Sequence, residues 1–178
     1  GRVAIVIDAG DSFTNNNTGD DEYITAYGGG GSGANYDGSP GTVYIKQGST
    51  GDLYINANSL DAMYADTEID TDSAATFTNV YLKNYARLLI ESDGSSFATT
   101  LLHIPTNTVF ESDATMTGYS IDEASIFLDG GTAKFDGALT LSALDTDDDD
   151  AETGTLITNG TTYISSGDVD LGSGFIWE

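Results

Sequence analysis

The sequence predicts an all-β fold, with a parallel β-helix favoured over an antiparallel β-sandwich or jelly roll. Short runs rich in β-branched and aromatic residues recur along the 178 residues, separated by turns rich in Gly, Asn, Asp and Ser. The last four runs are centred on Ile157, Tyr163, Val169 and Phe175, six residues apart. Such short, closely spaced strands favour stacked coils, whereas a hairpin turn such as Asn159-Gly160 suits the antiparallel alternative.

The N-terminal part of the chain contains the most strongly β-like segments. Residues 2–8 form the most apolar run and predict a buried strand, and residues 23–27 predict a second one. After a glycine-rich loop, two short strands at 42–45 and 52–56 flank the turn residues 46–51. We expect these strands to stack one turn after another.

The remaining strands follow at short intervals, interrupted by acidic loops at 66–72 and 145–152. We therefore expect residues 1–178 to form a single all-β domain. A final strand-like run at 175–177 suggests a module of a larger secreted chain or a fibre subunit. The other expected strands are 76–82, 86–91, 97–104, 108–111, 125–128, 132–135, 138–141, 155–158, 161–164, 169–171 and 175–177.

The charge balance is extreme, with 29 Asp and Glu residues against 5 Lys and Arg and a formal net charge of −24. Such a surface repels nucleic acid and anionic lipid, so neither is an expected partner. No apolar run approaches the ~18 residues needed to span a membrane, so no membrane insertion is expected. The absence of cysteine excludes disulfides and thiolate chemistry. Two explanations of the acidity remain open: structural Ca²⁺ between loop carboxylates, or adaptation to a saline habitat.

Two acidic segments are candidate calcium sites, because alternating carboxylates can point to one side and supply the oxygen ligands that Ca²⁺ prefers. The segment at 145–152 is not an EF-hand, since Asp150 and Leu156 replace the required Gly and Glu. A solvated acidic loop is the alternative interpretation. The predicted ligands are Asp145, Asp147, Asp149, Asp66, Glu68, Asp70 and Asp72.

Ten tyrosines suggest a second hypothesis, an exposed platform that stacks on sugar rings. The same residues would equally pack in ladders along a sheet face. The candidate glycan-binding residues are Tyr23, Tyr27, Tyr44 and Tyr54.

The sequence contains no catalytic motif. His103 is the single histidine and has no Gly-x-Ser-x-Gly element to accompany it, so we expect it on the outer face of a strand. Pairs of carboxylates would suit a polysaccharide hydrolase, but with 29 acids some pairs lie close by chance. A lyase would need clustered basic residues, which the chain lacks. The protein is therefore not expected to be an enzyme.

The first 58 residues contain the segments 2–5 (RVAI), 26–29 (AYGG), 41–46 (GTVYIK) and 51–56 (GDLYIN). Through these segments, residues 1–58 resemble the glycine-rich repeats of very large microbial cell-surface proteins. It implies right-handed parallel β-helix coils in a secreted or surface-anchored chain, and it implies no catalytic residues. We therefore expect an extracellular structural or adhesive module, calcium-stabilised, whose partners are neighbouring modules or identical subunits. A carbohydrate-binding module is the alternative, and a polysaccharide hydrolase or lyase is the least favoured.

Overall fold

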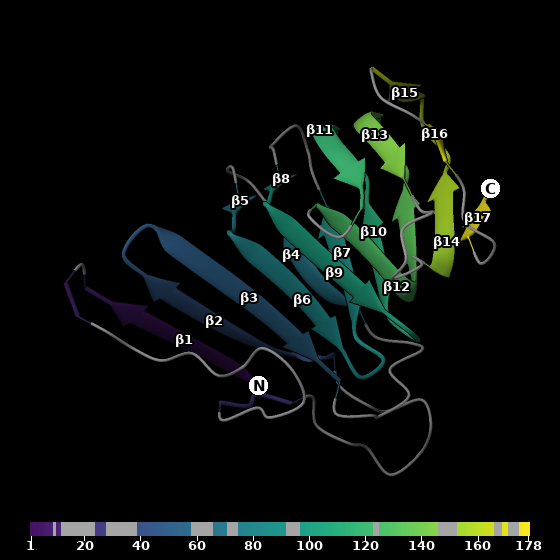
Figure 1. Ribbon diagram of the computed structural model, residues 1–178. Helices are drawn as coiled ribbons and strands as arrows, with labels where there is room; N and C mark the ends of the chain where they lie inside the picture. The colour runs from purple at the N-terminus through teal and green to yellow at the C-terminus, as the bar shows by residue number, and fades with distance from the viewer. Residues whose placement is uncertain are drawn as a thin grey trace, which may run out of the picture.

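The chain folds as a right-handed parallel β-helix of about four turns (Figure 1), which confirms the favoured fold prediction. The described part of this computed structural model contains strands and turns and no helix. It comprises residues 1–8, 10–11, 24–27, 39–57, 66–70, 75–91, 97–122, 125–145, 153–165, 169–170 and 175–178.

Seventeen strands are described, most of them two to seven residues long. Short strands separated by corners are what a coil needs to turn around a narrow interior. The strands are β1 Arg2–Ile7, β2 Gly41–Gln47, β3 Thr50–Asn56, β4 Thr67–Asp70, β5 Ala75–Thr76, β6 Asn79–Lys83, β7 Arg87–Glu91, β8 Phe97–Ala98, β9 Leu101–Pro105, β10 Val109–Ser112, β11 Met116–Ile121, β12 Ile126–Phe135, β13 Leu139–Asp145, β14 Thr153–Thr158, β15 Thr162–Ile164, β16 Val169–Asp170 and β17 Phe175–Trp177.

Three walls of parallel strands enclose the interior. The first wall contains β3, β6, β9 and the first half of β12. The second contains β4, β7, β10, the second half of β12, β14 and β17. The third contains the pair β5–β8 and the group β11, β13, β15 and β16. In the second wall Arg87 pairs with Val109, Val109 with Thr132 and Thr132 with Thr155, so one coil takes 22 or 23 residues there.

Inward-facing side chains stack in columns along the axis. In the first wall Leu53, Val80, Leu102 and Ile126 share one register position in successive coils, and all are buried. In the second wall Leu88, Phe110, Ala133 and Leu156 do the same. Burying one large apolar side chain contributes about 1.5–3 kcal/mol, so these columns supply the main driving force for stacking.

A column of phenylalanines fills the centre of the solenoid. The ring centroids of Phe77 and Phe97 lie 6.0 Å apart, those of Phe97 and Phe110 5.9 Å, and those of Phe110 and Phe135 5.7 Å. Tilted rings at these separations are favourable beyond their buried area. At the N-terminal end Tyr44 packs edge-on against Phe77 at 5.9 Å and closes this column.

The corner between the first and second walls repeats the same backbone conformation in successive coils. Tyr85, Asn107 and Gly130 share one register position there and have φ values of 67°, 63° and 81°, and Asn84, directly before Tyr85, has φ 50°. This left-handed region favours Gly and tolerates Asn, whose short polar side chain costs less there than other side chains. The corner residues therefore turn the chain at the same position of each coil.

The N-terminal pairing differs from the expectation that residues 42–56 stack turn after turn. Strands β2 and β3 form an antiparallel hairpin, with Gly41 opposite Asn56 and Gln47 opposite Thr50. Only Gly48 and Ser49 connect them, and Gly48 has φ 61°. A parallel crossover needs a dozen or more residues, so a two-residue turn permits only an antiparallel pair. Strand β1 then pairs parallel with β2.

Several strand boundaries also differ from the sequence expectations. Residues 24–27 join no ladder, whereas β4 is a strand in the predicted acidic loop because Thr67 and Ile69 face the core. Strand β11 was not predicted, since Gly118 and polar neighbours interrupt its apolar pattern. Strand β12 runs unbroken through the corner at Gly130, where two strands were expected.

Replacing Phe110 by Ala is expected to lower the free energy of unfolding by about 3–5 kcal/mol, because it removes a fully buried ring from the central column. Urea unfolding monitored by circular dichroism measures the change. The matched variant Phe127→Ala, at a half-buried outward position, should lose less than half as much. Equal losses would contradict the assignment of Phe110 to the core.

Candidate functional site

Exposed apolar side chains gather on the terminal strands of the solenoid. At the C-terminal end Trp177 occupies the register position below Leu156, which points into the interior, yet Trp177 is 39% exposed. Its neighbour Ile176 is 51% exposed, and Tyr163 on β15 is 63% exposed. At the N-terminal end Val6 on β1 is 67% exposed. These strands lie at opposite ends of the stack (Figure 1).

Within the described residues, the interior is covered at its N-terminal end and only partly covered at its C-terminal end. Tyr44 covers Phe77 at the N-terminal end. On the outer face of the same hairpin, Ala26, Val43, Ile45 and Tyr54 form a second small core.

At the C-terminal end Thr162 stacks below Leu139, and its buried Oγ1 has no hydrogen-bond partner among the described residues. Phe175 and Ile164 are only partly buried against the core. The C-terminal coil therefore presents interior positions that no further described coil covers.

An outward row of rings crosses the first wall. Tyr54, Tyr81, His103 and Phe127 stand at matching positions of β3, β6, β9 and β12. Tyr54 and Tyr81 are stacked at 5.1 Å with 12° between their planes, and His103 and Phe127 at 4.9 Å with 11°. Tyr81 meets His103 edge-on at 6.4 Å. The rings thus cover one another's faces along the axis.

Two of the four tyrosines predicted to form a sugar platform, Tyr44 and Tyr54, are packed against other rings. Tyr54 is 2% exposed, and Tyr44 lies on the opposite face of the sheet, where it packs against Phe77. Tyr27 is exposed, and Tyr23 lies outside the described residues. A sugar ring needs a free aromatic face, so ladder packing, the alternative interpretation, describes Tyr44 and Tyr54.

His103 lies half-buried on the outer face of β9, as expected from the sequence. Burial lowers the pKa of His103 below its ordinary value, Asp129 opposes that shift, and the charge of Lys83 adds to it. The Nε2 atom lies 3.5 Å from Asp129 Oδ2 and makes no hydrogen bond of good geometry. A neutral imidazole stacked on Phe127 serves as one more ring of the row.

The predicted calcium ligands do not converge within the described part of the chain. Asp66 pairs with Arg87, with 2.6 Å between Oδ1 and Nε, and Glu68 faces solvent from β4. Asp70 and Asp145 end their strands, and nothing is described of their side chains. Asp72, Asp147 and Asp149 lie outside the described residues. Among the described residues no three His, Cys, Asp or Glu side chains are grouped to hold a metal ion.

The backbone register nevertheless aligns carboxylate residues along the second wall. Asp70 pairs with Glu91. Ile90 pairs with Ser112, and Ser112 pairs with Phe135. The residues that directly follow these three, Glu91, Asp113 and Asp136, therefore stand at one position of successive coils. Adjacent parallel strands lie about 4.8 Å apart, so this acidic column places like charges close together. Counter-ions would relieve the repulsion.

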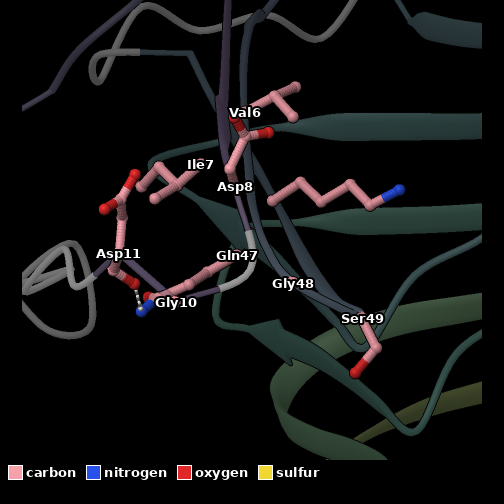
Figure 2. A pocket seen from close by; sticks show the side chains of 9 residues that line it. Val6, Ile7, Asp8, Gly10, Asp11, Gln47, Gly48 and Ser49 are labelled. Carbon is pink, nitrogen blue, oxygen red and sulfur yellow. Dashed lines mark hydrogen bonds between the residues drawn. The ribbon is translucent and has the colours of Figure 1, made fainter.

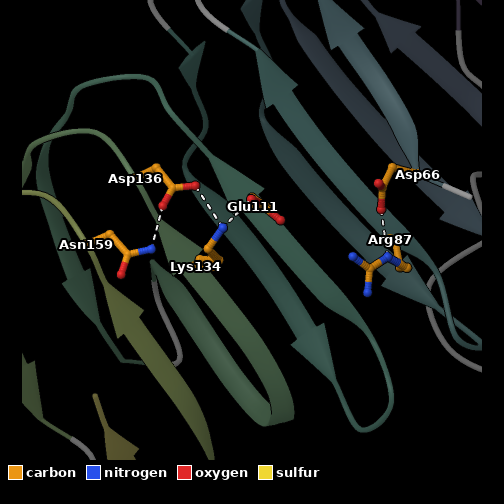
Figure 3. Close-up of polar contacts among 6 residues, drawn as sticks. All are labelled: Asp66, Arg87, Glu111, Lys134, Asp136 and Asn159. Carbon is orange, nitrogen blue, oxygen red and sulfur yellow. Dashed lines mark hydrogen bonds and ion pairs between the residues drawn. The ribbon is translucent and has the colours of Figure 1, made fainter. Parts of the chain in front are cut away.

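One basic residue neutralises the end of the acidic column (Figure 3). Lys134 Nζ donates to Glu111 Oε1 at 2.5 Å and to Asp136 Oδ2 at 2.8 Å. Asn159 Nδ2 donates to Asp136 Oδ1 at 2.6 Å. The hydrogen bond from Lys134, and to a smaller extent the one from Asn159, lower the pKa of Asp136. Hydrogen bonds to Asp136 and then Glu111 raise the pKa of Lys134.

Two polar hollows lie at the N-terminal end. The larger, about 670 Å³, lies between the end of β1 and the β2–β3 turn, and Asp8, Asp11, Lys46 and Ser49 line it (Figure 2). Gln47 Nε2 donates to the carbonyl of Asp11 across it at 3.4 Å. No histidine is present to activate Ser49. The smaller, about 520 Å³, includes the predicted ligands Asp66 and Glu68 beside Arg2.

Comparison of the chain with protein-family models, curated proteins and solved structures gave no match. Nothing in the described part of the chain is a helix long and apolar enough to cross a membrane.

Sequence reasoning missed Val6 and Ile176 as surface groups. A strand such as β1 looks buried from composition alone, because its β-branched run resembles that of an interior strand. The missing information is which strands end the stack.

Millimolar Ca²⁺ is expected to raise the thermal midpoint of EDTA-treated protein more than NaCl of equal ionic strength, since a divalent ion can bridge neighbouring carboxylates of the acidic column. Differential scanning calorimetry measures the midpoints. Glu91→Gln with Asp113→Asn should reduce the calcium increment, whereas Asp8→Asn with Asp11→Asn should leave it. An increment that NaCl reproduces would indicate a screened acidic surface.

Lys134→Gln is expected to lower the free energy of unfolding by about 1 kcal/mol at low salt, in the range of exposed ion-pair networks, because Glu111 and Asp136 lose their shared cation. Because the pKa of Asp136 is lowered in the folded protein, its ion pair stabilises the fold at pH values above the ordinary carboxyl pKa. This stabilisation is lost as the pH falls through the lowered pKa. Because the pKa of Lys134 is raised in the folded protein, its ion pairs stabilise the fold at pH values below the ordinary lysine pKa. This stabilisation is lost as the pH rises through the raised pKa.

The difference between the Lys134→Gln and unsubstituted proteins should therefore be largest from about pH 5 to 9, between the two ordinary pKa values. Urea unfolding across pH measures it, and Lys46→Gln, at an exposed site on β2, is the control. A difference independent of both pH and salt would show that Lys134 acts through packing.

Proposed function

We propose that this chain is a non-catalytic, extracellular structural or adhesive module that associates through the ends of its solenoid into rods or filaments. One observation carries the proposal: Val6 at one end and Ile176 with Trp177 at the other are exposed apolar side chains on strands that end the stack. Unpaired strand edges with apolar side chains are templates for pairing with another chain.

The remaining features support a structural role. The single histidine is part of a row of stacked rings, and neither polar hollow combines a nucleophile with a histidine base. The extracellular setting rests on the resemblance of residues 1–58 to surface-protein repeats. Calcium contributes by neutralising the acidic column, which would otherwise weaken each coil junction.

Carbohydrate recognition remains the alternative function, but no observation favours it here. The rings of Tyr54, Tyr81, His103 and Phe127 cover one another, which leaves few free faces for a sugar. Retention on insoluble polysaccharide would support it. Release of reducing or unsaturated sugars would support the hydrolase or lyase instead.

Association is tested by sedimentation velocity over a wide range of protein concentration, with negative-stain electron microscopy of the same samples. The sedimentation coefficient should rise with concentration, and rods longer than one module should be seen. The double variant Val6→Lys and Ile176→Lys should remain monomeric with an unchanged thermal midpoint. The control Tyr85→Lys, which changes an exposed side chain in the turn between β6 and β7, should associate normally. A monomer at all concentrations would refute the proposed function.

A further inference from the structure

The corner between the second and third walls continues the acidic column with a neutral residue. Asp113, Asp136 and Asn159 share one position there, because each directly follows a paired residue at the end of its strand. Gly137 and Gly160 come next in their coils, and Asn159-Gly160 is the single Asn-Gly pair in the sequence. This pair therefore lies at a corner of the solenoid and not in a hairpin turn.

Close stacking of the coils requires glycine after Asn159. A Cβ on Gly160 would collide with the carbonyl oxygen of Gly137, and a Cβ on Gly137 would collide with that of Asp113. A side chain at either position would therefore push the coils apart. Glycine is also the residue that least hinders attack by its own main-chain nitrogen on the side chain before it, because it carries no Cβ.

The two groups of the pair that could react face the same way, toward the preceding coil. Asn159 Nδ2 donates to Asp136 Oδ1 at 2.6 Å (Figure 3), and Gly160 N donates to the carbonyl of Phe135 at 3.4 Å. That carbonyl also accepts from Asn159 N at 2.9 Å, so its hydrogen bond with Gly160 N is the weaker of the two. One long hydrogen bond is thus the restraint on the Gly160 nitrogen.

Water has access to this corner. Asn159 is exposed. Asp113 and Asp136 are exposed at the same position, although a further coil follows each of them. The exposure of Asn159 is therefore a property of the corner and does not depend on where the chain ends.

We propose that Asn159 is a site of spontaneous deamidation in the folded protein. The Gly160 nitrogen, after losing its proton to hydroxide, bonds to Cγ of Asn159. The Cγ–Nδ2 bond breaks, and the departing amide nitrogen takes a proton from water and leaves as ammonia. Water then opens the cyclic imide. Cleavage between the Gly160 nitrogen and Cγ leaves an aspartate, and cleavage between that nitrogen and the main-chain carbonyl carbon leaves an isoaspartate.

The equivalent pair one coil earlier, Asp136-Gly137, is protected. An ionised carboxylate resists attack by a nucleophile, because its negative charge repels the incoming electron pair. Lys134 and Asn159 both donate to Asp136, and these hydrogen bonds lower the pKa of its carboxyl group, so it is ionised at neutral pH. The neutral amide of Asn159 lacks this protection, which directs the reaction to the later coil.

Either product changes the junction between the last two coils. A carboxylate at position 159 cannot donate to Asp136, and it places a further negative charge beside that residue. An isoaspartate also lengthens the main chain where Gly160 packs closely on Gly137. The deamidated protein should therefore have a lower thermal midpoint than the fresh protein.

Peptide mass spectrometry of the folded protein, incubated for days in warm, mildly alkaline buffer, measures the loss of the Asn159 amide. Asn79 is the internal control, since its Nδ2 also donates to a carboxylate of the preceding coil, Asp52 Oδ1 at 2.9 Å, but Val80 follows it. Asn159 should lose its amide at least tenfold faster than Asn79, and faster as the pH rises. Asn159→Gln should remain intact, and Asn159→Asp should reproduce the lowered thermal midpoint.

A parallel sample unfolded in urea gives the rate of the same reaction in the free chain. If the folded protein keeps the Asn159 amide while the unfolded chain loses it, the corner protects the pair and the inference is wrong. Equal rates at Asn159 and Asn79 would overturn it as well, because the corner would then direct nothing. The proposed function is independent of these outcomes, since association is measured on fresh protein.

Discussion

The structure depends on vertical alignment of side chains from coil to coil. Leu88, Phe110, Ala133 and Leu156 fall at one position of successive coils, and so each column is buried only if the coils are nearly equal in length. The steps along this column are 22, 23 and 23 residues, so the corners take up a difference of one residue without turning the next strand over. Tyr85, Asn107 and Gly130 share one register position at the corner, and their left-handed backbone turns the chain at the same place in each coil.

The strand pattern made the all-β solenoid predictable, because alternation of inward and outward residues is a local property. In contrast, the hairpin at β2–β3 depends on a turn of two residues, Gly48 and Ser49, where the sequence offers six turn-like residues from 46 to 51. Strand β4 was hidden by its outward charges, although Thr67 and Ile69 alternate with them and face the core. The acidic composition of this segment predicted a loop, although its alternation of inward and outward residues is that of a strand.

The candidate site was harder to predict than the fold. The tyrosine platform failed for Tyr44 and Tyr54 because adjacent strands of a hairpin place similar residues on opposite faces, which depends on register. The acidic column arises from Asp70, Glu91, Asp113 and Asp136, which are far apart in sequence and aligned only by the coil length.

The third wall has mechanical consequences. Strand β8 has no ladder with β11 among the described residues, and the hydroxyl of Tyr119 spans the gap: it accepts from Thr99 N at 3.1 Å and donates to Phe97 O at 3.4 Å. Burial raises the pKa of this tyrosine, so the hydroxyl keeps its proton at neutral pH. Because ladder bonds point along the solenoid axis, a pull on the two ends loads every junction in series. The junction that Tyr119 spans has ladders only in the first and second walls among the described residues, whereas the preceding junction has ladders in all three walls. Under tension a rod is therefore expected to part beside Tyr119 before it parts at the preceding junction.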